Sequence, residues 1–158
     1  MDWNKFRAWA ENAATNLLAS AKKFKESGTL DRCAKVIAIV AFGADGEASQ
    51  LERRKGIRAI AKRTNDAFDF TDMVDKVDEE IKTLERAKEA GDLDLGVAEL
   101  IRKIGKVTRE DALFLMEVAI GVANADGAQG EEAFSASEKA VVRKLALQFN
   151  LNPADFGL

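Results

Sequence analysis

The sequence predicts an all-α protein, and three observations support that prediction. Apolar residues make up 47% and charged residues 32% of the 158 residues, a balance typical of a folded globular chain. A single proline, beside plentiful Ala, Leu, Lys, Glu and Arg, favours helices along most of the chain. No stretch alternates apolar and polar residues with a period of two over a useful length, so we expect no β-sheet.

The first three helices follow from apolar periodicity and turn residues. Aromatic and aliphatic residues recur at three- and four-residue steps over about 2–26, which predicts an amphipathic helix that ends at Gly28. The next helix, over 30–44, is apolar nearly all round, which predicts burial on most of its sides. It stops at the turn dipeptide Asp45-Gly46, and a third helix with a basic exposed side follows over 49–64.

Four further helices complete an expected bundle of about seven. The fourth and fifth are expected over 71–90 and 93–106. The sixth follows a cap at Thr108 and is again apolar almost all round. The seventh covers 135–149, and a short terminal turn begins at Asn152-Pro153.

These elements divide one helical domain, 1–158, into five consecutive parts. They are the N-terminal helix (1–29), a first helical hairpin (30–65), connecting helices (66–107), a second helical hairpin (108–150) and the terminal turn (151–158). One pattern occurs in both hairpins: an apolar helix ends in Ala-Asp-Gly, and Ser-x-x-Glu, the spacing of a capping box, opens the next helix. The copies are Ala44-Asp45-Gly46 with Ser49 and Glu52, and Ala125-Asp126-Gly127 with Ser135 and Glu138. This duplication predicts a pseudo-two-fold unit that pairs the two most apolar helices at its centre.

Residue types that are absent or rare exclude several classes of site. Without histidine, the chain cannot build a Ser-His-Asp or Cys-His nucleophile, or a His-ligated zinc or haem site. One cysteine excludes disulfide frameworks, and Cys33 is expected to be a buried, inert thiol. A net charge of −3, and a basic stretch without interleaved aromatics over 53–63, do not favour nucleic-acid binding. With neither a secretory signal nor a long apolar span, a cytoplasmic location is expected.

Several of these residues together resemble a known family, the TerB (tellurite resistance) proteins with their TerB-like domain. The resemblance lies in both Ala-Asp-Gly…Ser-x-x-Glu units, in Phe68-Asp69-Phe70 and in the C-terminal stretch Leu151 to Leu158, and it covers about residues 30–158. The second unit departs from the pattern by an insertion over 129–133. The resemblance implies a non-enzymatic protein of a tellurite-resistance or stress system that acts as an adaptor or scaffold. Its implied partners are other proteins of that system, including a membrane protein of the TerC type.

Acidic residues gather at both inter-helix turns, and clustered oxygen ligands with flexible spacing are what hard divalent cations need. The resemblance implies that the acids repeated in the two units are metal ligands for Ca²⁺, Mg²⁺ or Mn²⁺. These are Asp45, Glu52, Asp126 and Glu138, with Glu47, Glu131 and Glu132 as weaker candidates. An aspartate that follows a helix C-terminus opposes the helix dipole, so Asp45 and Asp126 each need a compensating cation, helix N-terminus or arginine.

Two other functions stay open from the residues alone. A metal-dependent hydrolase using paired carboxylates requires the two acidic turns to meet in space. A purely structural interaction module needs no metal. In that case Asp-Gly only forms the turn at a helix C-terminus, and Ser-x-x-Glu only caps the N-terminus of the next helix.

Charged and aromatic surfaces suggest which contacts the chain makes. Acids recur at every third residue from Asp66 to Asp78, and together with the basic side over 53–63 they favour docking to a protein or self-association into a homodimer. The N-terminal helix carries Trp3, Phe6 and Trp9 among basic residues, so membrane contact is at most peripheral, at the inner membrane face.

Overall fold

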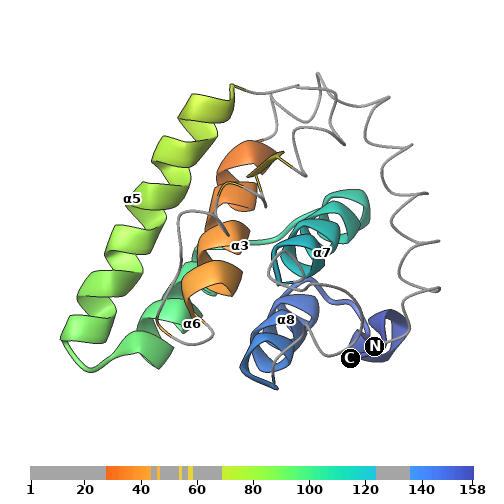
Figure 1. The fold of residues 1–158 in the computed structure, drawn as a ribbon. Helices are drawn as coiled ribbons and strands as arrows, with labels where there is room; N and C mark the ends of the chain where they lie inside the picture. The colour runs from red at the N-terminus through yellow and green to blue at the C-terminus, as the bar shows by residue number, and fades with distance from the viewer. Residues whose placement is uncertain (1–27, 44–45, 47–53, 55–56, 59–68, 124–135) are drawn as a thin grey trace.

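The computed structural model of the chain describes residues 28–43, 46, 54, 57–58, 69–123 and 136–158. Within these ranges the regular structure is five α-helices and one 3-10 helix, without a strand. They are α3 (Thr29–Gly43), α5 (Phe70–Glu89), α6 (Leu93–Ile104), α7 (Arg109–Ala123), α8 (Ala136–Gln148) and the 3-10 helix η2 (Pro153–Phe156). The all-α prediction is confirmed for the part of the chain that is described (Figure 1).

Two of the seven expected helices, over 2–26 and 49–64, fall wholly or mainly outside the described residues. Within the second of them, Arg54, Ile57 and Arg58 are helical, and Ile57 is fully buried. The count of seven helices, the duplicated unit and the division into five parts of one domain therefore stay predictions.

Local capping chemistry explains where the described helices begin. α5 starts at Phe70, one residue earlier than expected, because the Asp69 carboxylate accepts a hydrogen bond from the backbone N–H of Asp72 at 3.1 Å. Thr108 caps α7 as predicted, since its Oγ1 accepts from the N–H of Asp111 at 3.2 Å. Asn152 does the same for η2, with Pro153 as the first helical residue.

Helix ends are closed by residues with positive φ. After α5, Gly91 has a φ of +79°, and its N–H donates to the Lys88 carbonyl at 3.0 Å. The N–H of Asp92 donates to the Ala87 carbonyl at 2.8 Å, which completes a Schellman motif. Asn150 takes the equivalent left-handed position after α8, with a φ of 57°.

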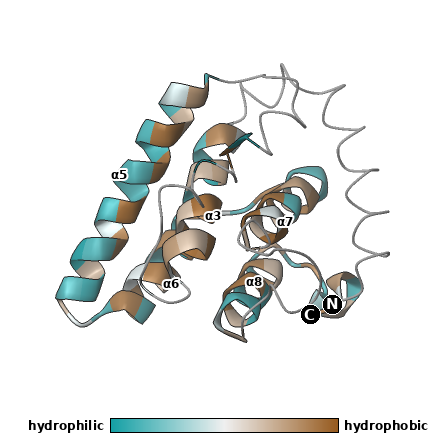
Figure 2. Cartoon of the chain, viewed as in Figure 1, coloured by the Kyte–Doolittle hydropathy of each residue, from teal (hydrophilic) through white to brown (hydrophobic). Residues whose placement is uncertain are grey.

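The core is built around α3 and α7, the two most apolar helices, which pack against each other. Figure 1 shows α3 between α5 on one side and α7 on the other, and α3 also contacts α6 and α8. Almost every residue of α3 from Cys33 to Gly43 is buried, as is most of α7. Figure 2 shows the contrast with α5, whose outer side is hydrophilic and whose inner stripe is apolar. α5 buries only four residues, Met73, Val77, Ile81 and Leu84, spaced at three and four.

Two glycines let α6 approach its neighbours closely. A Cβ added at Gly43 of α3 would meet Cγ2 of Val97 in α6 at 2.8 Å. A Cβ added at Gly96 of α6 would meet Cβ of Ala87 in α5 at 2.6 Å. Both distances are shorter than side-chain carbons tolerate, so these glycines allow α6 to pack between α3 and α5.

None of the described helices combines the length and the apolar character that crossing a bilayer demands.

Candidate functional site at the first inter-helix turn

The turn after α3 is the described part of the predicted acidic site. Gly46 is buried and has a φ of +78°, a backbone conformation that favours glycine. Its N–H donates to the carbonyl of Phe42 at 2.7 Å, which continues the hydrogen-bonding pattern of the last turn of α3. Glycine thus stands at the position of the predicted Asp-Gly turn whose backbone conformation requires it, while Asp45 lies outside the described residues.

A lysine from another helix reaches this turn. Lys88, in the last turn of α5, donates a hydrogen bond from Nζ to the carbonyl oxygen of Gly46 at 2.8 Å. The same Nζ lies 6.0 Å from the centroid of the Phe42 ring. Cε and Nζ of Lys88 would each lie 3.1 Å from a Cβ added at Gly46, so a larger residue there meets both this side chain and an unfavourable φ. An ammonium group from α5 therefore lies at the Gly46 carbonyl, just beyond the C-terminal end of α3.

Six of the predicted metal ligands lie outside the described residues: Asp45, Glu47, Glu52, Asp126, Glu131 and Glu132. Glu138 is described, and it lies half-buried in the first turn of α8, where a carboxylate suits the positive end of the helix. Within the described ranges, no three Asp, Glu, Cys or His side chains are grouped so that they could hold a metal ion. The four-ligand hypothesis therefore stays a prediction.

A second acidic region lies between the start of α3 and the first turns of α5. A cleft of about 250 Å³ is lined there by Asp31, Asp69 and Asp72, together with Lys76. Two of the three acids have structural roles, because Asp31 pairs with Lys76 Nζ at 2.6 Å and Asp69 caps α5. In the acidic series predicted from Asp66 to Asp78, Asp69 therefore serves as the N-cap of α5. Asp66 lies outside the described residues.

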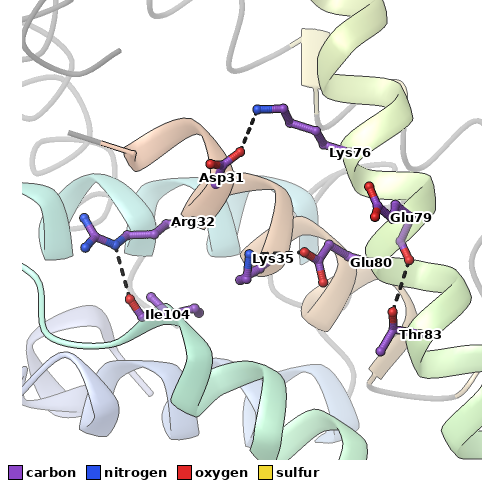
Figure 3. Close-up of polar contacts among 8 residues, drawn as sticks. All are labelled: Asp31, Arg32, Lys35, Lys76, Glu79, Glu80, Thr83 and Ile104. Atoms are coloured by element: carbon purple, nitrogen blue, oxygen red, sulfur yellow. Dashed lines mark hydrogen bonds and ion pairs between the residues drawn. The ribbon is translucent and has the colours of Figure 1, made fainter. Parts of the chain in front are cut away.

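Polar side chains also tie α3 to the helices around it (Figure 3). Lys35 Nζ lies 3.1 Å from Glu80 Oε1 of α5, with only about a fifth of each side chain exposed. Lys35 thus forms a largely buried ion pair with α5. Arg32 Nε donates to the carbonyl of Ile104, the last residue of α6, at 3.2 Å. Together these contacts fix the first half of α3 against α5 and α6, at the opposite end of the helix from the Gly46 turn.

Two buried groups complete the description of the polar interior. Burial raises the pKa of the Cys33 thiol far above its ordinary value of 9.0, and the charge of Asp111 acts in the same direction. Cys33 is therefore a protonated and weakly nucleophilic thiol, as expected. Glu117 of α7 is 4% exposed, although the apolar character of α7 gave no reason to expect a buried acid there. Its position between the apolar residues Met116 and Val118 is the feature of the sequence that could have indicated its burial.

The comparison with protein-family models identifies this fold. The model described as "Tellurite resistance protein TerB" matches residues 31–158. The chain belongs to the TerB family. The match begins within α3 and runs to the C-terminus, so the TerB region contains the first turn, Lys88 and the core built on α3 and α7. The chain has no significant match among curated proteins or among solved structures.

Family membership confirms the resemblance predicted from the duplicated turns. It supports a TerB domain of the tellurite-resistance type with a helical fold. The second TerB turn, at 125–127, and its insertion at 129–133 lie outside the described residues. Lys88 was absent from the predicted site because no local motif marks it, and its contact with Gly46 spans 42 positions of the chain.

Proposed function

We propose that this chain is a non-enzymatic TerB-type tellurite-resistance or stress-response protein. It acts as an adaptor that docks other proteins of that system and binds a divalent cation through its acidic inter-helix turns. The observation that carries the proposal is the TerB match over residues 31–158, which takes in nearly the whole described fold. An adaptor is favoured over an enzyme with a histidine base or a thiol nucleophile because the chain has no histidine and its one thiol is buried and protonated.

The exposed side of α5 supports docking. α5 spans 20 residues and contributes a single stripe to the core, so most of its surface faces outward. Asp72, Asp75 and Glu79 are exposed and lie at i, i+3 and i+7, on one side of the helix. Lys82 and Arg86 continue the same side toward the C-terminal end. Glu89, also exposed, follows Arg86 by three residues on this side, so the surface presents both acids and bases, which suits a partner of complementary charge.

Partner binding is tested in cells that carry the intact tellurite-resistance system. Asp75→Lys/Glu79→Lys reverses two charges of the α5 surface, and Glu99→Lys/Glu110→Lys makes the same change at exposed positions on α6 and α7. We expect affinity purification to recover a TerC-type membrane protein with the wild type and with the control, but several-fold less with the α5 variant. Equal recovery with all three chains would remove α5 from the docking surface. Sedimentation of the purified chain distinguishes a homodimer from a monomer.

Cation binding is tested by the melting temperature in EDTA and then in Ca²⁺, Mg²⁺ or Mn²⁺. A ligand at 100 times its Kd stabilises the native state by about 2.7 kcal/mol, which is a shift of several degrees. We expect such a shift for the wild type and its loss in Asp45→Asn/Asp126→Asn. If no ion shifts the melting temperature, the acidic turns serve only as helix ends and caps, as in the purely structural alternative.

A further inference from the structure

Two large apolar side chains are exposed on the part of the surface that the structure describes. Leu95 of α6 is 57% exposed and Leu147 of α8 is 65% exposed, whereas the other large apolar residues of the described ranges are buried or half-buried. A single exposed leucine is common on protein surfaces, so the shape and the charge around each of these two decide what they can bind.

The surface around Leu95 is concave and acidic. A cleft of about 390 Å³ at the corner between α5 and α6 is lined by Lys88, Gly91, Asp92, Leu93, Asp94 and Leu95. A cavity of roughly 150 Å³ already holds a benzene molecule, so this cleft has room for a leucine side chain. Asp92 is the N-cap of α6, but its carboxylate makes no capping hydrogen bond. The ammonium of Lys88 donates to the Gly46 carbonyl, and within the described residues neither Asp92 nor Asp94 forms an ion pair.

The surface around Leu147 is basic. Arg143 and Lys144 lie four and three positions before Leu147, so the three side chains share the outer side of α8. Both bases are exposed, and within the described residues neither forms an ion pair. The one acid of α8, Glu138, lies half-buried in the first turn of the helix. An exposed leucine flanked by two cations suits an apolar cleft with an acidic lining.

The cleft and the basic side of α8 lie on neighbouring helices. α6 and α8 contact each other, and both pack against α3 (Figure 1). Their outer sides therefore adjoin on the molecular surface. A two-fold rotation can then place α8 of a second copy on α6 of the first while α6 of the second copy meets α8 of the first. Such a dimer makes the same contact twice, and both leucines of each copy leave water.

We propose that a second copy of this chain docks at this face, with Leu147 of each copy in the α5–α6 cleft of the other. Arg143 and Lys144 then face Asp92 and Asp94 across both contacts, and the product is a closed two-fold dimer. This inference goes beyond the proposed adaptor function, because the contact uses neither the acidic inter-helix turns nor the charged outer side of α5.

Sedimentation velocity of the purified chain tests dimerisation, over about 1 µM to 1 mM so that weak dissociation constants are covered. We expect the wild type to pass from monomer to dimer, and Leu147→Asp to dimerise at least tenfold more weakly. Because Leu147 is exposed, the melting temperature of this variant at the lowest concentration should match that of the wild type, which shows that it is folded. A wild type that stays monomeric, species larger than a dimer, or equal dimerisation of both chains would overturn the proposal.

Mixing two charge-reversed chains tests which surfaces meet. Asp92→Lys/Asp94→Lys reverses the cleft, and Arg143→Glu/Lys144→Glu reverses the outer side of α8. Each variant alone brings like charges together at both contacts, so we expect its dimer to be at least tenfold weaker than that of the wild type. In an equimolar mixture both contacts pair opposite charges, so dimers of one chain of each kind should form as in the wild type. A mixture that dimerises no better than either variant would overturn the pairing of these two surfaces.

The matched control is Asp75→Lys/Glu79→Lys, which reverses two acids on the outer side of α5. This control should dimerise as the wild type does, and its loss of dimer would overturn the assignment to α6 and α8. These measurements use only the purified chain. A monomeric wild type would therefore contradict the dimer and leave the proposed docking of another protein on α5 unaffected.

Discussion

Two titratable residues lie in the buried interior of this TerB domain, where solvent does not reach their side chains. Cys33 is fully buried in α3, and burial together with Asp111 raises the pKa of its thiol. Glu117 of α7 is also buried, and it has apolar neighbours on both sides of it in the chain. Neither group is in contact with bulk solvent, so at this scale both contribute to the fold rather than to surface chemistry.

The raised pKa of Cys33 predicts a pH dependence of stability. The unfolded chain loses the thiol proton as the pH rises through about 9, whereas the native state keeps it. The stability that this residue contributes is therefore complete below pH 9 and falls above it, by up to about 1.4 kcal/mol per pH unit.

Urea denaturation of the wild type and Cys33→Ala at several pH values between about 8 and 10 measures this effect. The variant is expected to start from a lower stability, because the substitution removes buried volume, and then to lose less with rising pH. Parallel curves for the two chains would contradict the raised pKa.

At the scale of elements, α6 is positioned by how closely it can approach α3 and α5. A Cβ added at Gly43 would come too close to Val97, and one added at Gly96 would come too close to Ala87. Arg32 then binds the carbonyl of Ile104, one of the end carbonyls of α6 that have no partner within their own helix. Close backbone approach and one long side chain together place the end of α6 beside the start of α3.

Two glycine substitutions separate helix propensity from packing. In a helix interior, Gly→Ala adds about 0.5–1 kcal/mol of stability from propensity alone. At Gly121 of α7 a Cβ would meet nothing within 4 Å, so Gly121→Ala is expected to gain that amount.

At Gly96 the added Cβ meets Cβ of Ala87 at 2.6 Å, and neither short side chain can turn away. Gly96→Ala is therefore expected to lose about 1–3 kcal/mol, because α5 and α6 must move apart. Chemical denaturation of both variants measures the two changes. Equal signs at Gly96 and Gly121 would show that α6 can shift away from α5 at little cost.

At the scale of the whole molecule, α3 connects the described helices. It packs against α5, α6, α7 and α8, and its side chains are buried almost throughout. Ile37, fully buried near the middle of α3, contributes to the one core that these helices share. Damage to α3 should therefore spread to all of them.

Ile37→Ala is expected to lower the free energy of unfolding by about 2–5 kcal/mol, from lost burial and an internal cavity. Native-state hydrogen exchange should show the most protected amides of α5, α6 and α7 losing protection together. Leu147→Ala, at a side chain that is 65% exposed, serves as the control and should change stability by no more than about 0.5 kcal/mol. Loss of protection confined to α3 would contradict a shared core.

The sequence by itself determined the helical class and the ends of most described helices. Capping residues such as Thr108 and Asn152, and the positive-φ residue Gly91, act through hydrogen bonds that span only a few positions. Short sequence motifs encode local hydrogen bonds of this kind, so the ends of these helices can be predicted from the sequence. The duplicated Ala-Asp-Gly turns led to the TerB family for the same reason.

Tertiary structure alone decided which groups meet across the bundle. Lys88 is hydrogen-bonded to Gly46, which is 42 positions away in the chain, and Arg32 is hydrogen-bonded to Ile104, which is 72 positions away. No periodicity marks such pairs, because they depend on how closely α3, α5 and α6 approach one another and at which turn each helix stops. The sequence could state that Asp45 needs a compensating charge, but only the packed helices show an ammonium group at that turn.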